Sequence, residues 1–172
     1  MYKRQVYASD VNGDGITELP RAVLMAGYKD TSSSDAVYML DWYAYGIGKV
    51  PAKVATTYQN ISDAWSLLID QKWHDRITAI KANDGGLSYV EFFEYRKNKM
   101  SIPLFNIYCA TGSNREYYAE RTDLIQLGQT TQAIYFAKLT NEGEQSELAL
   151  TGDEIKARFS LVNQAWNCLL YT

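Results

Sequence analysis

Several residue types on which active sites usually depend are scarce or missing in this sequence. His74 is the single histidine among 172 residues, which argues against a zinc site built on histidines. There is no Gly-x-Ser-x-Gly elbow, Walker loop or Gly-x-Gly-x-x-Gly pattern, so the usual signals of a serine hydrolase, a P-loop enzyme or a dinucleotide-binding enzyme are missing. Glu91 and Glu94 are three positions apart and face opposite sides of a strand, which argues against a glycosidase pair.

Excess positive charge and long apolar runs are also missing. The formal net charge is −3 and the sequence pI is near 5.2, whereas nucleic-acid-binding domains usually have a basic patch or a high pI. No run of about twenty apolar residues exists, so no membrane span is expected. Met1-Tyr2-Lys3-Arg4 does not start a signal peptide, and we expect an export signal to lie upstream of this chain.

The chain has only two cysteines, Cys109 and Cys168. Cys109 falls in an expected strand and Cys168 at the end of an expected helix, so the two could pair if that helix crosses the sheet. Two buried free thiols are the alternative, because free cysteine is usually buried. A small catalytic domain with a Cys109–His74 dyad is a further hypothesis. The simpler interpretation is a buried cysteine and a surface histidine.

What the sequence does contain is a run of oxygen-bearing side chains between residues 10 and 18, Asp-Val-Asn-Gly-Asp-Gly-Ile-Thr-Glu. These side chains stand at relative positions one, three, five and nine. Gly15 stands at position six, where a calcium loop makes a sharp turn. The spacing predicts a Ca²⁺ loop; the alternative is a polar Asn-Gly/Asp-Gly turn without a metal.

Each expected ligand has a distinct role in such a loop. Ca²⁺ takes about six to eight oxygens, and the side chains of Asp10, Asn12 and Asp14 would supply three of them. The backbone carbonyl of Ile16 and the carboxylate of Glu18 would supply others. An EF-hand ends with a glutamate at position twelve, but Arg21 stands there and follows a proline, so the loop is not an EF-hand.

The loop and the strand-like residues 21–25 that follow it resemble the calcium loop of FG-GAP/VCBS-type repeats over residues 6–28. That resemblance implies a β-propeller repeat of a secreted or surface protein, although the family more often has Asp at the position of Glu18. The chain has one copy and a propeller needs about four to eight blades. We therefore expect a C-terminal piece of a longer protein that carries the end of a repeat array.

The remaining sequence has a fainter resemblance. An aromatic segment at 58–60, the run 63–69, Gln71-Lys72-Trp73 and the segment 103–107 are similar to uncharacterised secreted proteins and lipoproteins of Gram-positive bacteria. They are also faintly similar to PsbP/Mog1-like α+β domains. The latter similarity concerns the fold and implies no activity.

Alternating apolar residues predict mostly strands. We expect strands at 36–45, 54–58 and 104–110, a hairpin of 76–81 with 87–96, and a hairpin of 124–127 with 133–139 around Gly128. Ser113–Glu116 and Thr151–Glu154 are capping boxes that start two helices, the first of which is expected to end at about Thr122. The second helix is expected to carry a stripe of Ile155, Phe159, Val162 and Trp166. The acidic stretch 141–147 is expected to be a solvated loop.

The expected architecture is an α+β fold with a predominantly antiparallel sheet and two helices, preceded by the β segment with the calcium loop. A domain boundary is predicted near 46–52, dividing the chain into a segment 1–48 and a domain 49–172. Aromatic residues offer a possible platform for sugars or peptides, although burial in the core is the favoured alternative; they are Trp42, Tyr43 and Tyr45, or Tyr117 and Tyr118.

The predicted function is a non-catalytic extracellular or cell-surface module, or lipoprotein, in which Ca²⁺ rigidifies the N-terminal loop. Its partner would be a polysaccharide, a peptide or another protein domain. The alternative is an accessory domain of a secreted enzyme whose catalytic part lies upstream.

Overall fold

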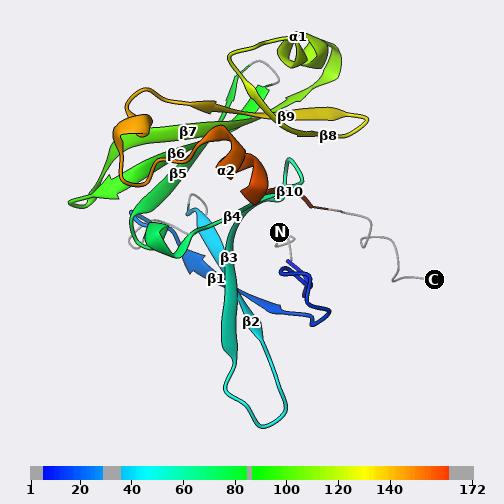
Figure 1. Ribbon diagram of the computed structural model, residues 1–172, viewed down its shortest axis with the longest axis vertical. Coiled ribbons are helices and arrows are strands. Elements are labelled where there is room, and N and C mark those ends of the chain that lie inside the picture. The colour runs from blue at the N-terminus through cyan, green and yellow to red at the C-terminus, as the bar shows by residue number, and fades with distance from the viewer. Residues whose placement is uncertain (1–5, 29–35, 85–86, 163–172) are drawn as a thin grey trace.

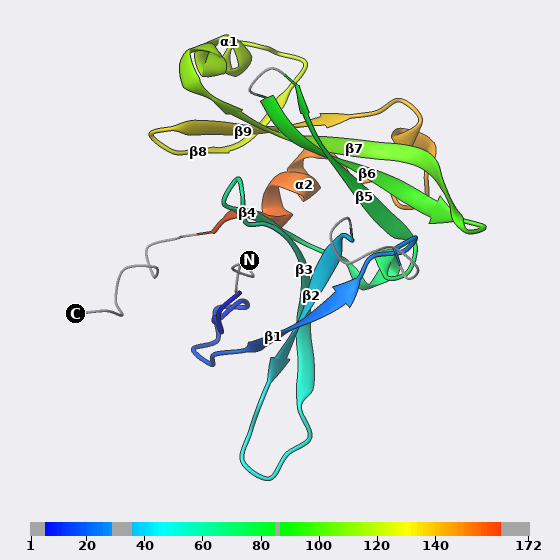
Figure 2. The ribbon, with the colours of Figure 1, turned by 180° about the vertical axis from the view of Figure 1, so that it is seen from behind.

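The chain forms two antiparallel five-stranded sheets that pack on each other, with the strands of one running across those of the other (Figures 1 and 2). The structure is a computed structural model and describes residues 6–28, 36–84 and 87–162. The first sheet has the order β1-β2-β3-β4-β10, with bounds Leu19–Leu24, Tyr38–Ala44, Ala52–Asn60, Trp65–Leu68 and Phe159–Leu161. The second has the order β5-β6-β7-β9-β8, with bounds Ile77–Asp84, Leu87–Arg96, Lys99–Thr111, Ala133–Leu139 and Ile125–Gln129.

The core lies between the two sheets and is rich in aromatic rings. Tyr58 of β3 meets Phe92 of β6 edge to face, with ring centroids 5.3 Å apart. Phe92 stacks on Phe105 of β7 at 4.8 Å, and Phe105 lies 5.9 Å from Trp73. Large rings bury much apolar area, and such pairs add stabilisation beyond their area. These rings therefore join the two sheets.

The predicted strands are present, with longer or shifted ends. The strand expected at 36–45 is β2, the one at 54–58 extends to β3, and the one at 104–110 extends to β7. The first predicted hairpin is β5–β6, in which β5 extends to Asp84, and the residues at its turn, 85–86, lie outside the described residues. In the second hairpin the turn was misplaced, because Gly128 lies within β8 and the chain turns at 130–132.

The residues 46–52, where a domain boundary was predicted, form the connection between β2 and β3. These two strands are hydrogen-bonded neighbours, with Met39 opposite Tyr58 and Leu40 opposite Thr57. Met39 and Tyr58 also belong to the same buried cluster. The strands on the two sides of this connection thus share one sheet and one core.

Two α-helices complete the fold, both shorter than predicted. A 3₁₀ turn at Gly112–Asn114 leads into α1 (Arg115–Ala119), which stops before the expected end at 122. The capping box at Thr151 is confirmed, since its hydroxyl accepts from the Glu154 amide and the Glu154 carboxylate accepts from the Thr151 amide. The helix that it starts, α2 (Gly152–Arg158), contacts β4, β8 and β9 at one end of the sheet interface.

The predicted stripe on the second helix was wrong beyond Ile155. The helix ends at Arg158, and Phe159 opens β10, which pairs with β4. Phe159 is still buried, but it reaches the core from a strand. Trp166 lies outside the described residues. In the part of the chain that is described, no helix combines the length and the apolar character needed to cross a membrane.

The fold thus agrees with the coarse prediction, α+β with antiparallel strands and two helices. The strands form two sheets, however, where one was expected.

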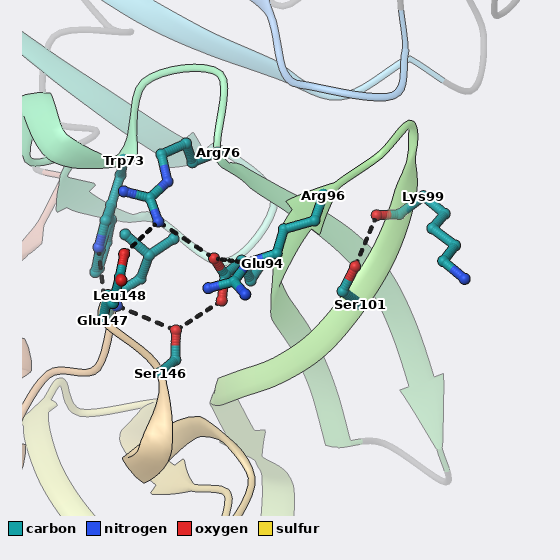
Figure 3. Close-up of polar contacts among 9 residues, drawn as sticks. All are labelled: Trp73, Arg76, Glu94, Arg96, Lys99, Ser101, Ser146, Glu147 and Leu148. Atoms are coloured by element: carbon teal, nitrogen blue, oxygen red, sulfur yellow. Dashed lines mark hydrogen bonds and ion pairs between the residues drawn. The ribbon is translucent and has the colours of Figure 1, made fainter.

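A buried carboxylate ties β6 to the acidic stretch near the C-terminus (Figure 3). Glu94 is completely buried. One of its oxygens accepts from the Arg96 Nε at 2.5 Å and lies 3.4 Å from an Arg76 nitrogen. The other accepts from the Ser146 hydroxyl at 2.7 Å. The stretch 141–147 is therefore not a fully solvated loop, because Ser146 is buried beside this carboxylate.

The pKa of Glu94 is set by opposing effects. Burial would raise it, but the hydrogen bonds from Ser146 and Arg96 and the arginine charges outweigh burial and leave the pKa below its usual value. A carboxyl with a lowered native pKa stabilises the fold above its unfolded pKa, and this contribution is lost as the pH falls.

We predict that Glu94→Gln lowers the free energy of unfolding by about 2–4 kcal/mol at pH 7, because two arginines lose their charged partner. Since protonated Glu94 resembles glutamine, the difference from the parent should shrink as the pH falls below the usual glutamate pKa. Urea unfolding across a pH series measures it. The control is Glu147→Gln: Glu147 binds the same Arg76 at 3.0 Å but is exposed, so we expect a loss below about 1 kcal/mol. Equal stability of Glu94→Gln and the parent at pH 7 would contradict the assigned role.

Candidate metal centre

The N-terminal loop is closed by a backbone bridge just before the first strand. Ser9 and Glu18 exchange both backbone hydrogen bonds, at 3.1 and 3.0 Å. Because β1 begins at Leu19, the loop is attached directly to the edge strand of the first sheet (Figure 1). The acidic side chains of this loop can come close together only if the backbone between them turns sharply.

Two glycines and one aspartate make that turn. Gly13 and Gly15 have φ of +75° and +84°, in the left-handed region that costs other residues free energy. The Asp10 carboxylate accepts from the Gly13 amide at 2.7 Å and the Gly15 amide at 2.9 Å. The hydrogen bond from Gly15 is the largest cause of a pKa of Asp10 below its usual value. Asp10 is therefore ionised and orders the loop.

Three carboxylates meet inside the loop. Asp10, Asp14 and Glu18 each place a carboxylate oxygen so that all three lie within 4.8 Å of one another. In the described residues, this is the one group of three or more histidine, cysteine or acidic side chains that is placed to hold a metal ion. Like charges this close repel one another, so a bound cation would stabilise the arrangement.

Glu18 has a feature that hydrogen bonding within the loop does not explain. The residue is completely buried, and its Oε2 accepts from the Val11 amide at 2.9 Å. Its Oε1 is also buried and has no hydrogen-bond partner in the described structure. A buried polar atom without a partner is costly, and a buried carboxylate clustered with two aspartates is suited to a cation.

The other two predicted ligands lie in the same turn with different contacts. The side-chain oxygen of Asn12 accepts from the Asp14 amide at 3.0 Å, and its amide nitrogen donates to Asp14 Oδ2 at 2.9 Å. The Ile16 amide donates to Asp14 Oδ1 at 2.8 Å. The structure therefore brings three of the five predicted residues together through their carboxylates, and Asn12 and Ile16 position Asp14.

The cysteine alternative has little support from the geometry. Cys109 is buried in β7 opposite Ser88, and burial raises the pKa of its thiol to about 11. The thiol is therefore protonated at neutral pH and a poor nucleophile. His74 follows a 3₁₀ turn, is exposed to solvent and contacts Asp75 at 3.1 Å. Cys168 lies outside the described residues, so its pairing with Cys109 stays a prediction.

The aromatic residues divide between core and surface. Trp42 is buried and donates its indole N–H to the Thr57 hydroxyl at 2.8 Å, so it does not belong to a surface platform. Tyr45 and Tyr117 are exposed. Tyr118 is half-buried and stacks on Phe136, with centroids 5.5 Å apart.

Sequence reasoning missed the Glu94 network. Arg76 and Arg96 contact this glutamate from the segment before β5 and from β6, and Ser146 contacts it from a segment that is distant in the sequence. The signal was present as a glutamate two positions after Phe92 on the inward face of a strand. Its partners are up to 52 positions away, and no local pattern predicts them.

We predict that the Cys109 thiol of a Cys168→Ser variant reacts with a disulfide reagent about a hundredfold more slowly in the native protein than in guanidinium, because burial keeps it protonated and inaccessible. Ser113→Cys, at an exposed position, in a chain lacking both native cysteines is the control and should react at a similar rate in both states. A native Cys109 that reacts as fast as the control would reopen the thiol-based alternative.

Comparison with models of protein families, with curated proteins and with solved structures gave no match for this chain. Its function must therefore be argued from the residues and their geometry, and the Asp10–Asp14–Glu18 cluster is the group that the structure best supports as a site.

Proposed function

We propose that this chain is a non-catalytic extracellular or cell-surface module whose N-terminal loop binds one structural Ca²⁺ through Asp10, Asp14 and Glu18. The observation that carries the proposal is that the buried Glu18 carboxylate belongs to a cluster with Asp10 and Asp14 whose oxygens lie within 4.8 Å of one another, while its Oε1 has no hydrogen-bond partner in the described structure. A cation at this place would neutralise repulsion among the carboxylates and give the buried oxygen a partner.

The donor atoms favour calcium over the other biological cations. All three side chains offer hard carboxylate oxygens, and no histidine or cysteine takes part, which disfavours zinc and copper. Ca²⁺ accepts irregular oxygen cages, whereas Mg²⁺ requires near-ideal octahedral geometry and keeps several waters. A surface loop with two exposed aspartates and one buried glutamate suits the former.

The role of the ion would be to fix the loop on the edge of the first sheet. Glu18 belongs both to the carboxylate cluster and to the backbone bridge with Ser9, and β1 follows it immediately. Ion binding would therefore hold the entry into β1. Extracellular modules commonly use weak Ca²⁺ sites in this structural way, with dissociation constants on the order of 10⁻⁴–10⁻³ M.

The proposed location and partners follow from the resemblance to FG-GAP/VCBS-type repeats. A polysaccharide, a peptide or another protein domain is the proposed partner. An accessory domain of a secreted enzyme, with its catalytic part upstream, is the second candidate and would use the same loop as a rigid connection.

We predict that the chain binds one Ca²⁺ in calorimetric titration and that its melting temperature is higher in Ca²⁺ than in chelator. Ligand linkage gives about 2.7 kcal/mol of stabilisation at a hundredfold excess over the dissociation constant. Asp14→Ala should abolish both the heat and the shift. Glu120→Ala, which removes an exposed acidic group outside the loop, should leave both unchanged.

Glu18→Gln separates binding from folding. It removes a buried charge, so the melting temperature in chelator should stay equal or rise, while the Ca²⁺-dependent shift disappears. A parent protein without heat or shift, or a Glu18→Gln variant that keeps the full shift, would make the loop a polar turn.

A further inference from the structure

The β2–β3 hairpin projects away from the rest of the molecule. Its strands pair from Met39–Tyr58 to Ala44–Ala52, and the residues beyond the last pair form a tip that stands clear of both sheets in the two opposite views (Figures 1 and 2). All residues from 45 to 54 are exposed. The exposed segment 45–54, which comprises the residues beyond the last pair and the first three residues of β3, is called the hairpin tip below.

The turn at the end of the hairpin presents apolar side chains to the outside. The Lys49 amide donates to the Gly46 carbonyl at 3.1 Å, and Gly48 has a φ of +69°, as a tight turn requires. Ile47 is at the corner of this turn, with a relative exposure of 105%; Val50 follows with 88% and Tyr45 with 56%. Apolar residues gathered at one exposed place usually mark an interaction site.

The charge of the hairpin differs from that of the chain. There is no aspartate or glutamate from residue 42 to residue 62, although the whole chain has 20 acidic residues and a net charge of −3. The tip carries Lys49 and Lys53, of which Lys53 pairs with Asp41 at 2.7 Å. The apolar tip is therefore locally cationic on an acidic protein.

From this combination we propose that the hairpin tip inserts into the interface of a bilayer that contains anionic phospholipids. Ile47 and Val50 would enter the acyl boundary, and Tyr45 would lie at headgroup level, where amphipathic rings are favoured. Lys49 would meet the lipid phosphates, since basic residues are attracted to anionic surfaces within a Debye length. The turn leaves backbone groups that only water or headgroups can satisfy, so insertion is shallow.

A protein partner fits this surface less well. A stable protein interface buries about 800 Å² on each partner, and a single turn with three large apolar side chains offers much less. A membrane needs no such area, because it surrounds a protruding tip. The proposal is independent of the Ca²⁺ site, which lies in another loop.

We expect the chain to co-sediment with vesicles of phosphatidylcholine and phosphatidylglycerol, but much less with phosphatidylcholine alone, and the binding to weaken as salt is added. The double variant Ile47→Asp/Val50→Asp should reduce partitioning at least about tenfold, because two apolar side chains no longer leave water. Lys49→Glu should reduce it about fivefold or more. Since these side chains are exposed, the melting temperature should not change.

The double variant Ser113→Asp/Tyr117→Asp is the matched control, because it adds the same two negative charges at exposed positions in and just before α1, and it should bind like the parent. Binding should also persist in chelator. In addition, an environment-sensitive dye on Ile47→Cys should shift to the blue with anionic vesicles, whereas the dye on Ser113→Cys should not. Absence of binding, equal binding to neutral vesicles, or binding unchanged by the tip variants would overturn the proposal. A tip-dependent dimer without vesicle binding would assign the tip to a protein contact and overturn it equally.

Discussion

The contact of aromatic rings between the two sheets is the interaction on which the rest of the structure depends. Tyr58, Phe92 and Phe105 bring β3, β6 and β7 together, and an antiparallel sheet needs such cover on one face. Once the sheets are joined, the remaining features occupy their margins. The Glu94 network lies where β6 ends, the carboxylate loop lies before edge strand β1, and the hairpin tip extends beyond the last pair of β2 and β3.

Two of these features, the Glu94 network and the carboxylate loop, each contain a buried glutamate, but the two glutamates differ in their hydrogen bonds. Glu94 has both oxygens satisfied by an arginine and a serine, so its burial is explained by the protein alone. Glu18 is equally buried, but one of its oxygens has no partner. The difference between these two glutamates, more than the number of acidic residues in either cluster, directs attention to the N-terminal loop as the place for a cation.

Features that depend on near neighbours could be predicted from the sequence. The alternation in β2, the presence of the β5–β6 hairpin and the Thr151 capping box follow from local spacing. The end of α2 could not be predicted, because Phe159 leaves the helix to pair with Leu67, far away in the sequence. In the loop, spacing identified the three carboxylates, but only the fold reveals that Glu18 is buried. The local roles of Asn12 and Ile16 likewise needed coordinates.

The order of strands in the first sheet has a consequence for folding during synthesis. β5, β6 and β7 pair in consecutive hairpins, and β9 pairs with β7 after the segment 112–132, so all strands of the second sheet are present once residue 139 has left the ribosome. The first sheet remains incomplete, since in the described residues the strand that pairs with the outer edge of β4 is β10, at 159–161. Until then, β4 presents unpaired amides and carbonyls, and such an edge invites pairing with other chains. Pairing with the three-residue strand β10 removes this open edge, so the last described strand of the chain closes the first sheet.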